Sequence, residues 1–269
     1  PVSISTNEIS GWPAGPEITS ETGVLMDADS GTLLYSKGGD EIRYPASITK
    51  IMTLLLAVEN CSLKEDVVFT ETGTRDISWD SGNIGMQVGE VMSMRACLYA
   101  LVIRSANEVA AQIAEHVGGT EQHFVDMMNE KLKELGLSDT AHFTNCVGLY
   151  DENHYCTVYD IAMILEAAID HPQCREVLST KKYTTSSTPE HPEGIRISNW
   201  FLRRIEDKDT GGEVICGKTG FVAQSGSCAV SYGMDESGKE YICATVNAHS
   251  GWRCIYDHVE LYKRFAKTI

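Results

Sequence analysis

The chain has 269 residues, enough for one large domain or two small ones with a sizeable buried core. Its 42% hydrophobic and 22% charged residues are typical of a soluble globular protein, and they exclude a fibre, a disordered chain and a multi-pass membrane protein. The formal charge of −16, with no long run of lysine or arginine, argues against nucleic acid as the main partner.

The first part of the chain predicts an irregular arm, then a hairpin, then a series of helices. Residues 1–20 show little apolar periodicity, and the β-prone runs 24–26 and 32–35 flank a turn that contains Gly31. Residues 62–92 predict loops with short strands. Helices are expected where apolar residues recur every three or four positions. These predicted helices cover approximately residues 47–60, 93–105, 109–118, 124–136 and 160–169.

The last part of the chain is rich in β-prone residues. Three strand-like runs follow a Thr-, Ser- and Pro-rich stretch at 181–198, and the chain closes with a helix from about 253 to 267. The three strand-like runs are 213–219, 227–233 and 241–248. Strands at both ends with helices between predict an α+β fold, in which helices flank one antiparallel sheet of about five strands. We expect a single domain over 1–269, made of a sheet subdomain (about 20–60 plus 176–269) and an inserted helical subdomain (about 61–175).

Nine cysteines are an odd number, so at least one cannot pair within the chain. No C-x-x-C and no H-E-x-x-H occurs, so the usual spacings of zinc ligands are missing. Most of the cysteines lie in apolar stretches, where a free thiol behaves as a small hydrophobic group. We expect mainly buried thiols, with one or two disulfides as the alternative.

The first motif is Ser47-Ile-Thr-Lys50, at the start of a predicted helix. A serine hydroxyl is a poor nucleophile unless a neighbouring group takes its proton. At i and i+3 of a helix start the two side chains face the same side, so a lysine with a lowered pKa can serve as that base. The pattern alone is weak, because Ser179-Thr-Lys-Lys182 also matches it and an ordinary N-cap would explain Ser47.

The second motif, Ser105-Ala-Asn107, is one of three S-x-N triplets, and its position distinguishes it from the other two. The triplets that begin at Ser5 and Ser81 lie in the irregular arm and in a Gly-rich loop, where such residues form ordinary turns. Ser105 lies between two amphipathic helices, so a rigid turn can present its hydroxyl and the nearby amide to a cleft. A helix-to-helix cap is the alternative.

The third motif is Lys218-Thr-Gly220, which occurs once and ends a strand-like run. A lysine and a threonine hydroxyl on an edge strand can hold a substrate carboxylate, and the glycine lets another backbone approach closely. A turn at a strand end is the alternative.

Together the three motifs are far more specific than any one of them. Their order and contexts (helix start, inter-helix turn, sheet strand) match the signature of serine penicillin-recognising enzymes. The sequence resembles the D-alanyl-D-alanine carboxypeptidases, the low-molecular-mass penicillin-binding proteins of peptidase family S11. The segments that carry the resemblance are 44–53, 105–111, 143–149, 153–157, 160–162 and 217–221.

The resemblance implies a β-lactamase/transpeptidase-like fold and a catalytic role for three side chains. Ser47 would attack the carbonyl between two terminal D-alanines and form an acyl-enzyme. Lys50 would accept the serine proton, and a trio with Ser105 and Lys218 could share that duty. Water would then release the shortened stem peptide.

The resemblance also implies a set of substrate-binding groups. Asn107 would hydrogen-bond the substrate's peptide group, while Lys218 and Thr219, next to Gly220, would hold its terminal carboxylate. The oxyanion hole would use backbone N–H groups, one of them from Ser47. No metal and no organic cofactor is implied.

The implied partners are a peptidoglycan stem peptide that ends in D-Ala-D-Ala and β-lactam antibiotics, which would mimic it and acylate Ser47. Such an enzyme works outside the cytoplasm, after removal of a signal peptide. Membrane attachment is not visible in this chain, and nucleic acid is not an expected partner.

One departure and two alternatives remain. Glu108 stands where family members more often carry Asp, and we expect it on a solvent-facing side. A β-lactamase would need a glutamate on a loop to activate water, but the candidate Glu166 lies in an apolar mid-helix stretch without a following Asn. A non-catalytic penicillin-binding sensor or scaffold is the other alternative, and the three intact motifs argue against it.

Overall fold

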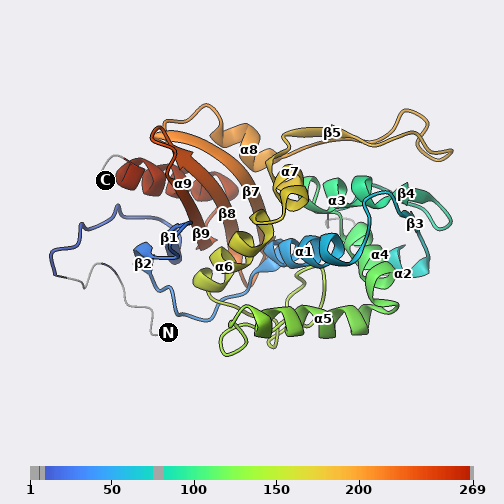
Figure 1. Cartoon of the computed structure of the whole chain (residues 1–269), viewed down its shortest axis with the longest axis horizontal. Helices are drawn as coiled ribbons and strands as arrows, with labels where there is room; N and C mark the ends of the chain where they lie inside the picture. The colour runs from blue at the N-terminus through green and yellow to red at the C-terminus, as the bar shows by residue number, and fades with distance from the viewer. Residues whose placement is uncertain (1–5, 7–9, 75–81, 267–269) are drawn as a thin grey trace.

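A five-stranded antiparallel sheet forms the centre of the computed structural model, which describes residue 6, residues 10–74 and residues 82–266 (Figure 1). The strand order is β2-β1-β9-β8-β7. The strands are β1 Thr22–Asp27, β2 Leu33–Lys37, β7 Gly212–Val222, β8 Gly226–Asp235 and β9 Glu240–Ala248. The prediction of one antiparallel sheet of about five strands flanked by helices is confirmed.

The sheet joins the two ends of the chain, because β1 pairs with β9 over its whole length. Side chains alternate between the two faces. Val24 packs into one hydrophobic core and Leu25 into the other, and their partners Ala244 and Cys243 alternate in the same way. A sheet that is covered on both faces has buried residues at nearly every position of its central strands, and that is the burial pattern of β1, β8 and β9.

Helices cover each face of the sheet. α8 Trp200–Ile205 and α9 Gly251–Ala266 share one hydrophobic core with one face, and α6 Val158–Ile169 and α7 Pro172–Ser179 pack on the other (Figure 1). α6 begins with a capping box between Thr157 and Asp160. The S-x-x-K, S-x-N and K-T-G motifs lie on the α6 side, where α1 Lys50–Asn60 also packs.

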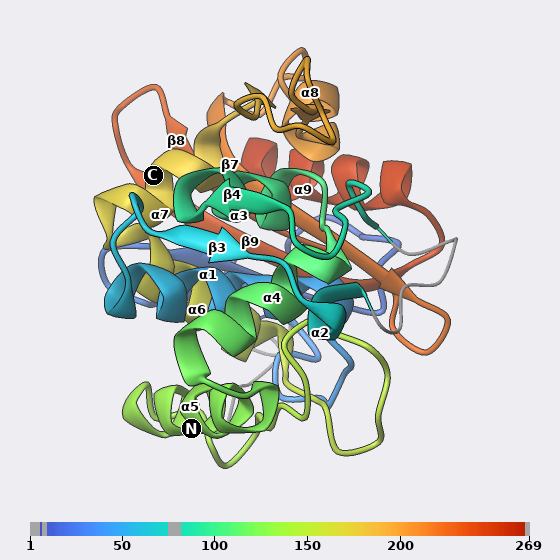
Figure 2. The same cartoon turned by 90° about the vertical axis from the view of Figure 1, so that its right-hand side faces the viewer.

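The helical region beyond α1 consists of α3 Met94–Ile103, α4 Asn107–Gly118, α5 Glu121–Glu134 and the short α2 Glu71–Thr74. In Figure 2, α5 lies at the bottom and α8 at the top of the molecule. Two small hairpins complete the fold: β3 Asp66–Val68 with β4 Val91–Ser93, and β5 Lys182–Thr184 with β6 Arg196–Ser198. Ser93 caps α3, as its position before the apolar run predicts.

Three helices are absent from the sequence prediction, and one of them is the four-residue α2, which lies where loops and short strands were expected. We expected the chain to leave its fifth helix near Pro172, but Pro172 is the first residue of α7, where a proline's missing N–H costs nothing. α8 has only six residues, too few for apolar periodicity to reveal it.

All nine cysteines are free thiols, and eight of them are buried. This agrees with the expectation of buried thiols, and the alternative of one or two disulfides is wrong. The triplets that begin at Ser5 and Ser81 include residues outside the described ones. Within the described ranges, no helix combines the length and apolar character needed to cross a lipid bilayer.

Candidate active site

Ser47 and Lys50 face each other at the start of α1. A 3₁₀ turn, η2 Ala46–Thr49, leads directly into α1, and side chains three residues apart eclipse in such a turn. Lys50 Nζ lies 2.9 Å from Ser47 Oγ and donates to the carbonyl of Val147 at 3.0 Å. The second bond fixes the amine beside the hydroxyl, so the S-x-x-K motif brings a serine hydroxyl and a lysine amine into hydrogen-bonding contact.

Burial brings the pKa of Lys50 close to neutral pH. Its side chain is fully buried, and desolvation lowers its pKa to about 7. Among the described residues, no carboxylate forms an ion pair with Lys50 that would restore the charged form. A large share of Lys50 is therefore neutral at pH 7, with a lone pair that can accept the serine proton.

A second hydroxyl–amine pair joins the other two motifs. Ser105 lies in the turn between α3 and α4, and Lys218 on β7 donates to its Oγ at 3.1 Å and to the carbonyl of Thr219 at 2.7 Å. Lys218 is also buried, and its pKa lies well below the usual range because of that burial and, secondarily, the charge of Lys50. Two lysines thus share one water-poor space between the sheet and the helices.

The backbone is strained at two points of this arrangement. Ala46 and Ser105 have φ values of 50° and 55°, in the left-handed region that L-residues with a Cβ seldom adopt. One is the residue before the nucleophile and the other belongs to the second motif itself. Strain of this kind persists only where the surroundings impose it, and it is typical of functional sites.

Two glycines allow close approach to the nucleophile. A Cβ on Gly220 would lie 2.8 Å from the backbone nitrogen of Ser47, and a Cβ on Gly148 would lie 1.8 Å from the carbonyl oxygen of Ala46. Strand β7 and the 145–149 loop therefore press on η2 from two sides. The glycine of the K-T-G motif is required by this contact.

A groove of about 360 Å³ opens over these groups. Four of the predicted site residues, Ser47, Ser105, Thr219 and Gly220, line it. Lys50 and Lys218 do not line the groove, but each forms a hydrogen bond to one of its two serines, Ser47 and Ser105. Asn107, half-buried, begins α4 two residues after Ser105, and its N–H donates to Gly82. The groove-lining residues are Ser47, Ser105, Trp200, Thr219, Gly220, Phe221, Ser227, Cys228 and Gly251.

Five of these groove residues were not singled out from the sequence: Trp200, Phe221, Ser227, Cys228 and Gly251. They come from two strands and two helices that meet only in the folded chain, so no spacing could reveal them. The sequence offered a signal for one of the five, Phe221, because it directly follows the K-T-G motif.

The expectation that Glu108 faces solvent is wrong. Its side chain is 1% exposed, and its carboxylate accepts N–H bonds from Ile84, Gly85 and Met86. Burial raises its pKa, which those backbone bonds partly oppose. Glu108 therefore holds the 82–86 loop against the start of α4, beside Ser105.

Three other polar residues, Ser179, Glu166 and His154, lie outside the groove. Ser179 ends α7 and donates to the carbonyl of Glu176, and Glu166 lies within α6. His154 is buried between Thr49 and Thr144, and burial lowers its pKa to about 4. It is therefore a neutral hydrogen-bonding residue that supports the first turn of α1.

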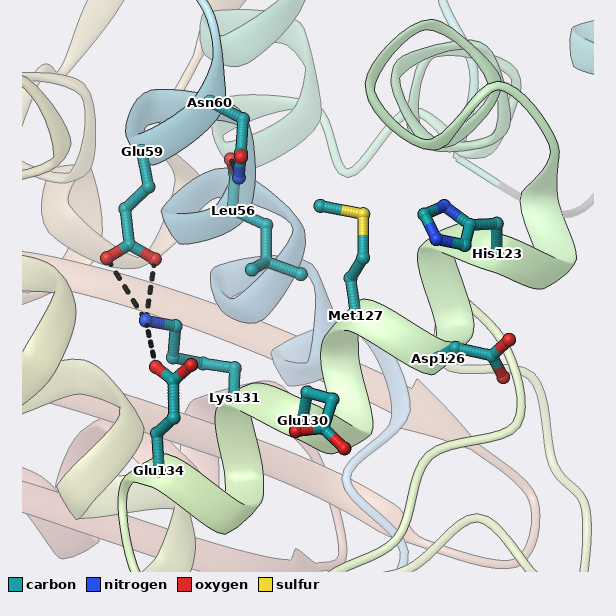
Figure 3. Close-up of a pocket in the computed structure, with 9 residues that line it drawn as sticks. All are labelled: Leu56, Glu59, Asn60, His123, Asp126, Met127, Glu130, Lys131 and Glu134. Atoms are coloured by element: carbon teal, nitrogen blue, oxygen red, sulfur yellow. Dashed lines mark hydrogen bonds and ion pairs between the residues drawn. The ribbon is translucent and has the colours of Figure 1, made fainter.

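A second hollow, of about 380 Å³, lies between α1 and α5 (Figure 3). Lys131 spans its rim and pairs with Glu59 on α1 and Glu134 on α5. None of the motif residues lines it. The reactive groups are therefore concentrated in the groove above Ser47.

Comparison with known proteins agrees with this geometry. A family model described as D-alanyl-D-alanine carboxypeptidase matches residues 10–250. DacF, a D-alanyl-D-alanine carboxypeptidase of Bacillus subtilis, is 34% identical over 163 residues, 60% of this chain and 42% of its own length. DacA of Haemophilus influenzae is 32% identical over 190 residues, 68% of this chain and 48% of its own. The chain thus spans about half the length of the curated relatives it matches.

The fold is also that of a solved relative. The Streptomyces K15 DD-transpeptidase superposes with a TM-score of 0.83 at 25% identity, covering 93% of this chain and 99% of that one. Because the family model matches most of the residues, including all three motifs, the chain belongs to the D-alanyl-D-alanine carboxypeptidase family.

Proposed function

We propose that this chain is a serine D-alanyl-D-alanine carboxypeptidase, which removes the terminal D-alanine from peptidoglycan stem pentapeptides through an acyl-enzyme on Ser47. One observation carries the proposal: Ser47 Oγ lies 2.9 Å from the amine of Lys50, whose burial lowers its pKa to about 7. This pair supplies a nucleophile and its base where a groove admits a substrate.

In the acylation step, Ser47 Oγ gives its proton to neutral Lys50 as it attacks the carbonyl carbon of the penultimate D-alanine. Charge develops on the carbonyl oxygen, where the backbone N–H of Ser47 would stabilise it. The C–N bond breaks, the departing amine takes up the proton, and D-alanine leaves. The proton reaches the amine directly from Lys50 or through Ser105 and Lys218, which are 3.1 Å apart.

Substrate binding uses the same groove. The terminal carboxylate would lie against Thr219 and the charge of Lys218, when that lysine is protonated, and Asn107 would hydrogen-bond the peptide group. Gly220 keeps β7 close enough for an extended substrate to lie along it. In the second step water attacks the ester carbonyl, its proton returns through the same bases, and the shortened stem peptide leaves Ser47 free.

We also propose that sheet subdomain and helical subdomain work as one catalytic domain, because the motif residues come from both and meet at one groove. The substrate is a cell-wall peptide, so the reaction takes place outside the cytoplasm. β-lactams would acylate Ser47 as mimics of D-Ala-D-Ala and remain bound, because the ester they form hydrolyses slowly.

The test is intact mass against time after mixing with benzylpenicillin, beside Ser47→Ala, together with release of D-alanine from a peptide ending in D-Ala-D-Ala. A stable adduct and D-alanine release by the wild type, both lost in Ser47→Ala, are the expected results. An adduct that disappears within seconds while penicillin is consumed would indicate a β-lactamase. An unmodified wild type would favour the non-catalytic scaffold.

A further inference from the structure

Three different metal-ligand types meet at the far end of α1. They are the thiol of Cys61, the carboxylate of Glu65 and the imidazole of His116, whose ligand atoms all lie within 4.8 Å of one another. Cys61 follows the last residue of α1, Glu65 lies in the loop before β3, and His116 is in the last turn of α4. The groups come from two segments, the 61–65 loop that follows α1 and the last turn of α4, and converge on one point.

The distances suit a tetrahedral ion. His116 Nε2 and Glu65 Oε1 are 3.2 Å apart. Two such ligands, each about 2.0–2.2 Å from a zinc ion, would subtend roughly 100° at the metal, close to the tetrahedral angle. The sulfur of Cys61 lies within 4.8 Å of both atoms. A thiolate and a neighbouring ligand of a tetrahedral zinc ion lie about 3.6 Å apart, so a shift of at most about 1 Å completes the third side.

The surroundings already orient one of the ligands, because the second oxygen of Glu65 accepts the N–H of Ser62. The backbone N–H of Cys61 donates to the carbonyl of Ala57, which fixes the main chain of Cys61 at the end of α1. The side chains of His116 and Glu65 are 23% and 41% exposed, so an ion can enter from solvent. Ligands oriented by hydrogen bonds and open to solvent are the features expected of a metal site.

The donor set selects the kind of metal. Mg²⁺ and Ca²⁺ prefer all-oxygen sites, whereas a thiolate with an imidazole suits Zn²⁺ and related transition-metal ions. Binding would release the thiol proton, because thiolate is the form that ligates. With three protein ligands, the fourth position of a tetrahedral ion would be taken by water.

We propose that Cys61, Glu65 and His116 form a structural site for a zinc-type divalent ion. The site links the ends of α1 and α4, the two helices that pack together and begin at the S-x-x-K and S-x-N motifs. It lies roughly 20 Å along α1 from Ser47, given the rise of a helix. The ion therefore takes no part in the reaction of Ser47 and acts by holding the two helices.

The test uses Co²⁺ as a spectroscopic probe in the presence of a phosphine reductant. Wild type is expected to bind one Co²⁺, with visible bands of a tetrahedral ion and a near-ultraviolet thiolate charge-transfer band, and Zn²⁺ is expected to displace it. Cys61→Ser should lose the charge-transfer band, and His116→Ala should bind at least about tenfold more weakly. His171→Ala, which removes another histidine–glutamate pair but no thiol, should bind like wild type.

Two readouts separate the site from folding defects. Acylation of Ser47 by benzylpenicillin should be unchanged in each folded variant, with or without metal. In the wild type, Zn²⁺ should slow alkylation of Cys61, the cysteine that is not fully buried, as measured by peptide mass spectrometry. A charge-transfer band that persists in Cys61→Ser, or equal alkylation rates with and without Zn²⁺, would overturn the proposal.

Discussion

At the scale of single residues, the site depends on amines that are kept from water. Lys50 and Lys218 are both buried, and the charge of Lys50 further disfavours protonation of Lys218. Two ammonium groups in one water-poor space repel each other, so at neutral pH the pair has a strong tendency to hold fewer than two protons. That is the condition under which a lysine can accept a proton from a serine.

Acylation of Ser47 is expected to depend on the protonation of Lys50. Because the pKa of Lys50 is about 7, the rate should rise as pH increases through that value and level off where the amine is neutral. Lys50→Arg, which stays charged, should lower the rate by about 10²- to 10⁴-fold. The measurement is the rate of penicillin adduct formation by mass spectrometry between pH 5 and 9.

The matched control for that experiment is Lys182→Arg. Lys182 completes the second S-x-x-K pattern but is exposed on β5. The Lys182→Arg variant should therefore form the penicillin adduct at the same rate as the wild type. A flat pH profile in the wild type would mean that Lys50 is not the base.

At the scale of elements, the site is assembled by segments that press on two short turns. Strand β7 and the 145–149 loop hold η2, and the 82–86 loop holds the turn that contains Ser105. The last contact depends on Glu108, whose buried carboxylate binds three successive backbone N–H groups. A carboxylate in such a nest acts as a clamp between a loop and a helix.

Replacing Glu108 with alanine should destabilise the protein by about 2–4 kcal/mol, because it leaves buried N–H groups without acceptors. Ser105 should lose its fixed position as well, so the rate of D-alanine release should also be lower in Glu108→Ala than in the wild type. Urea unfolding measures the first effect. Glu130→Ala, at an exposed position of α5, should change stability by less than about 0.5 kcal/mol, and a similar small change for Glu108→Ala would refute the clamp.

At the scale of the whole molecule, each of the two cores contains a buried, neutral histidine. His154 supports α1 on the helical side. His258 lies on α9 and faces the sheet, within hydrogen-bonding distance of Ser231 on β8 at 2.7 Å and Thr245 on β9 at 2.9 Å. Burial lowers the pKa of each to about 4. Both cores therefore depend on histidines that resist protonation.

Stability should decline as the solution is acidified from pH 6.5 towards 4. In that window the unfolded chain binds protons at these histidines and the folded chain does not, so each contributes a loss of up to roughly 3 kcal/mol. His258→Gln should reduce the difference in unfolding free energy between pH 7 and pH 5. His123→Gln, an exposed position, should leave it unchanged, and equal slopes for His258→Gln and wild type would contradict the argument.

The sequence by itself determined the central sheet, most of the helices and the positions of the three motifs. Apolar periodicity located α1 and α3 to α6, and the order of S-x-x-K, S-x-N and K-T-G distinguished Ser47 from the matching pattern at Ser179. Local patterns suffice for these features because helix faces, caps and strand runs are determined by residues a few positions apart.

The tertiary structure alone decided which of these groups meet and how they are charged. The pKa of the Lys50 amine is about 7 because the fold buries that side chain. Glu108 holds the 82–86 loop because that loop folds over a position that we expected to face solvent. Trp200 and Phe221 meet at the groove above Ser47, and at a different place the 61–65 loop meets His116. Each of these contacts joins segments that are far apart in the chain. Burial and contact between distant segments arise only when the chain packs, so local sequence carries no record of them.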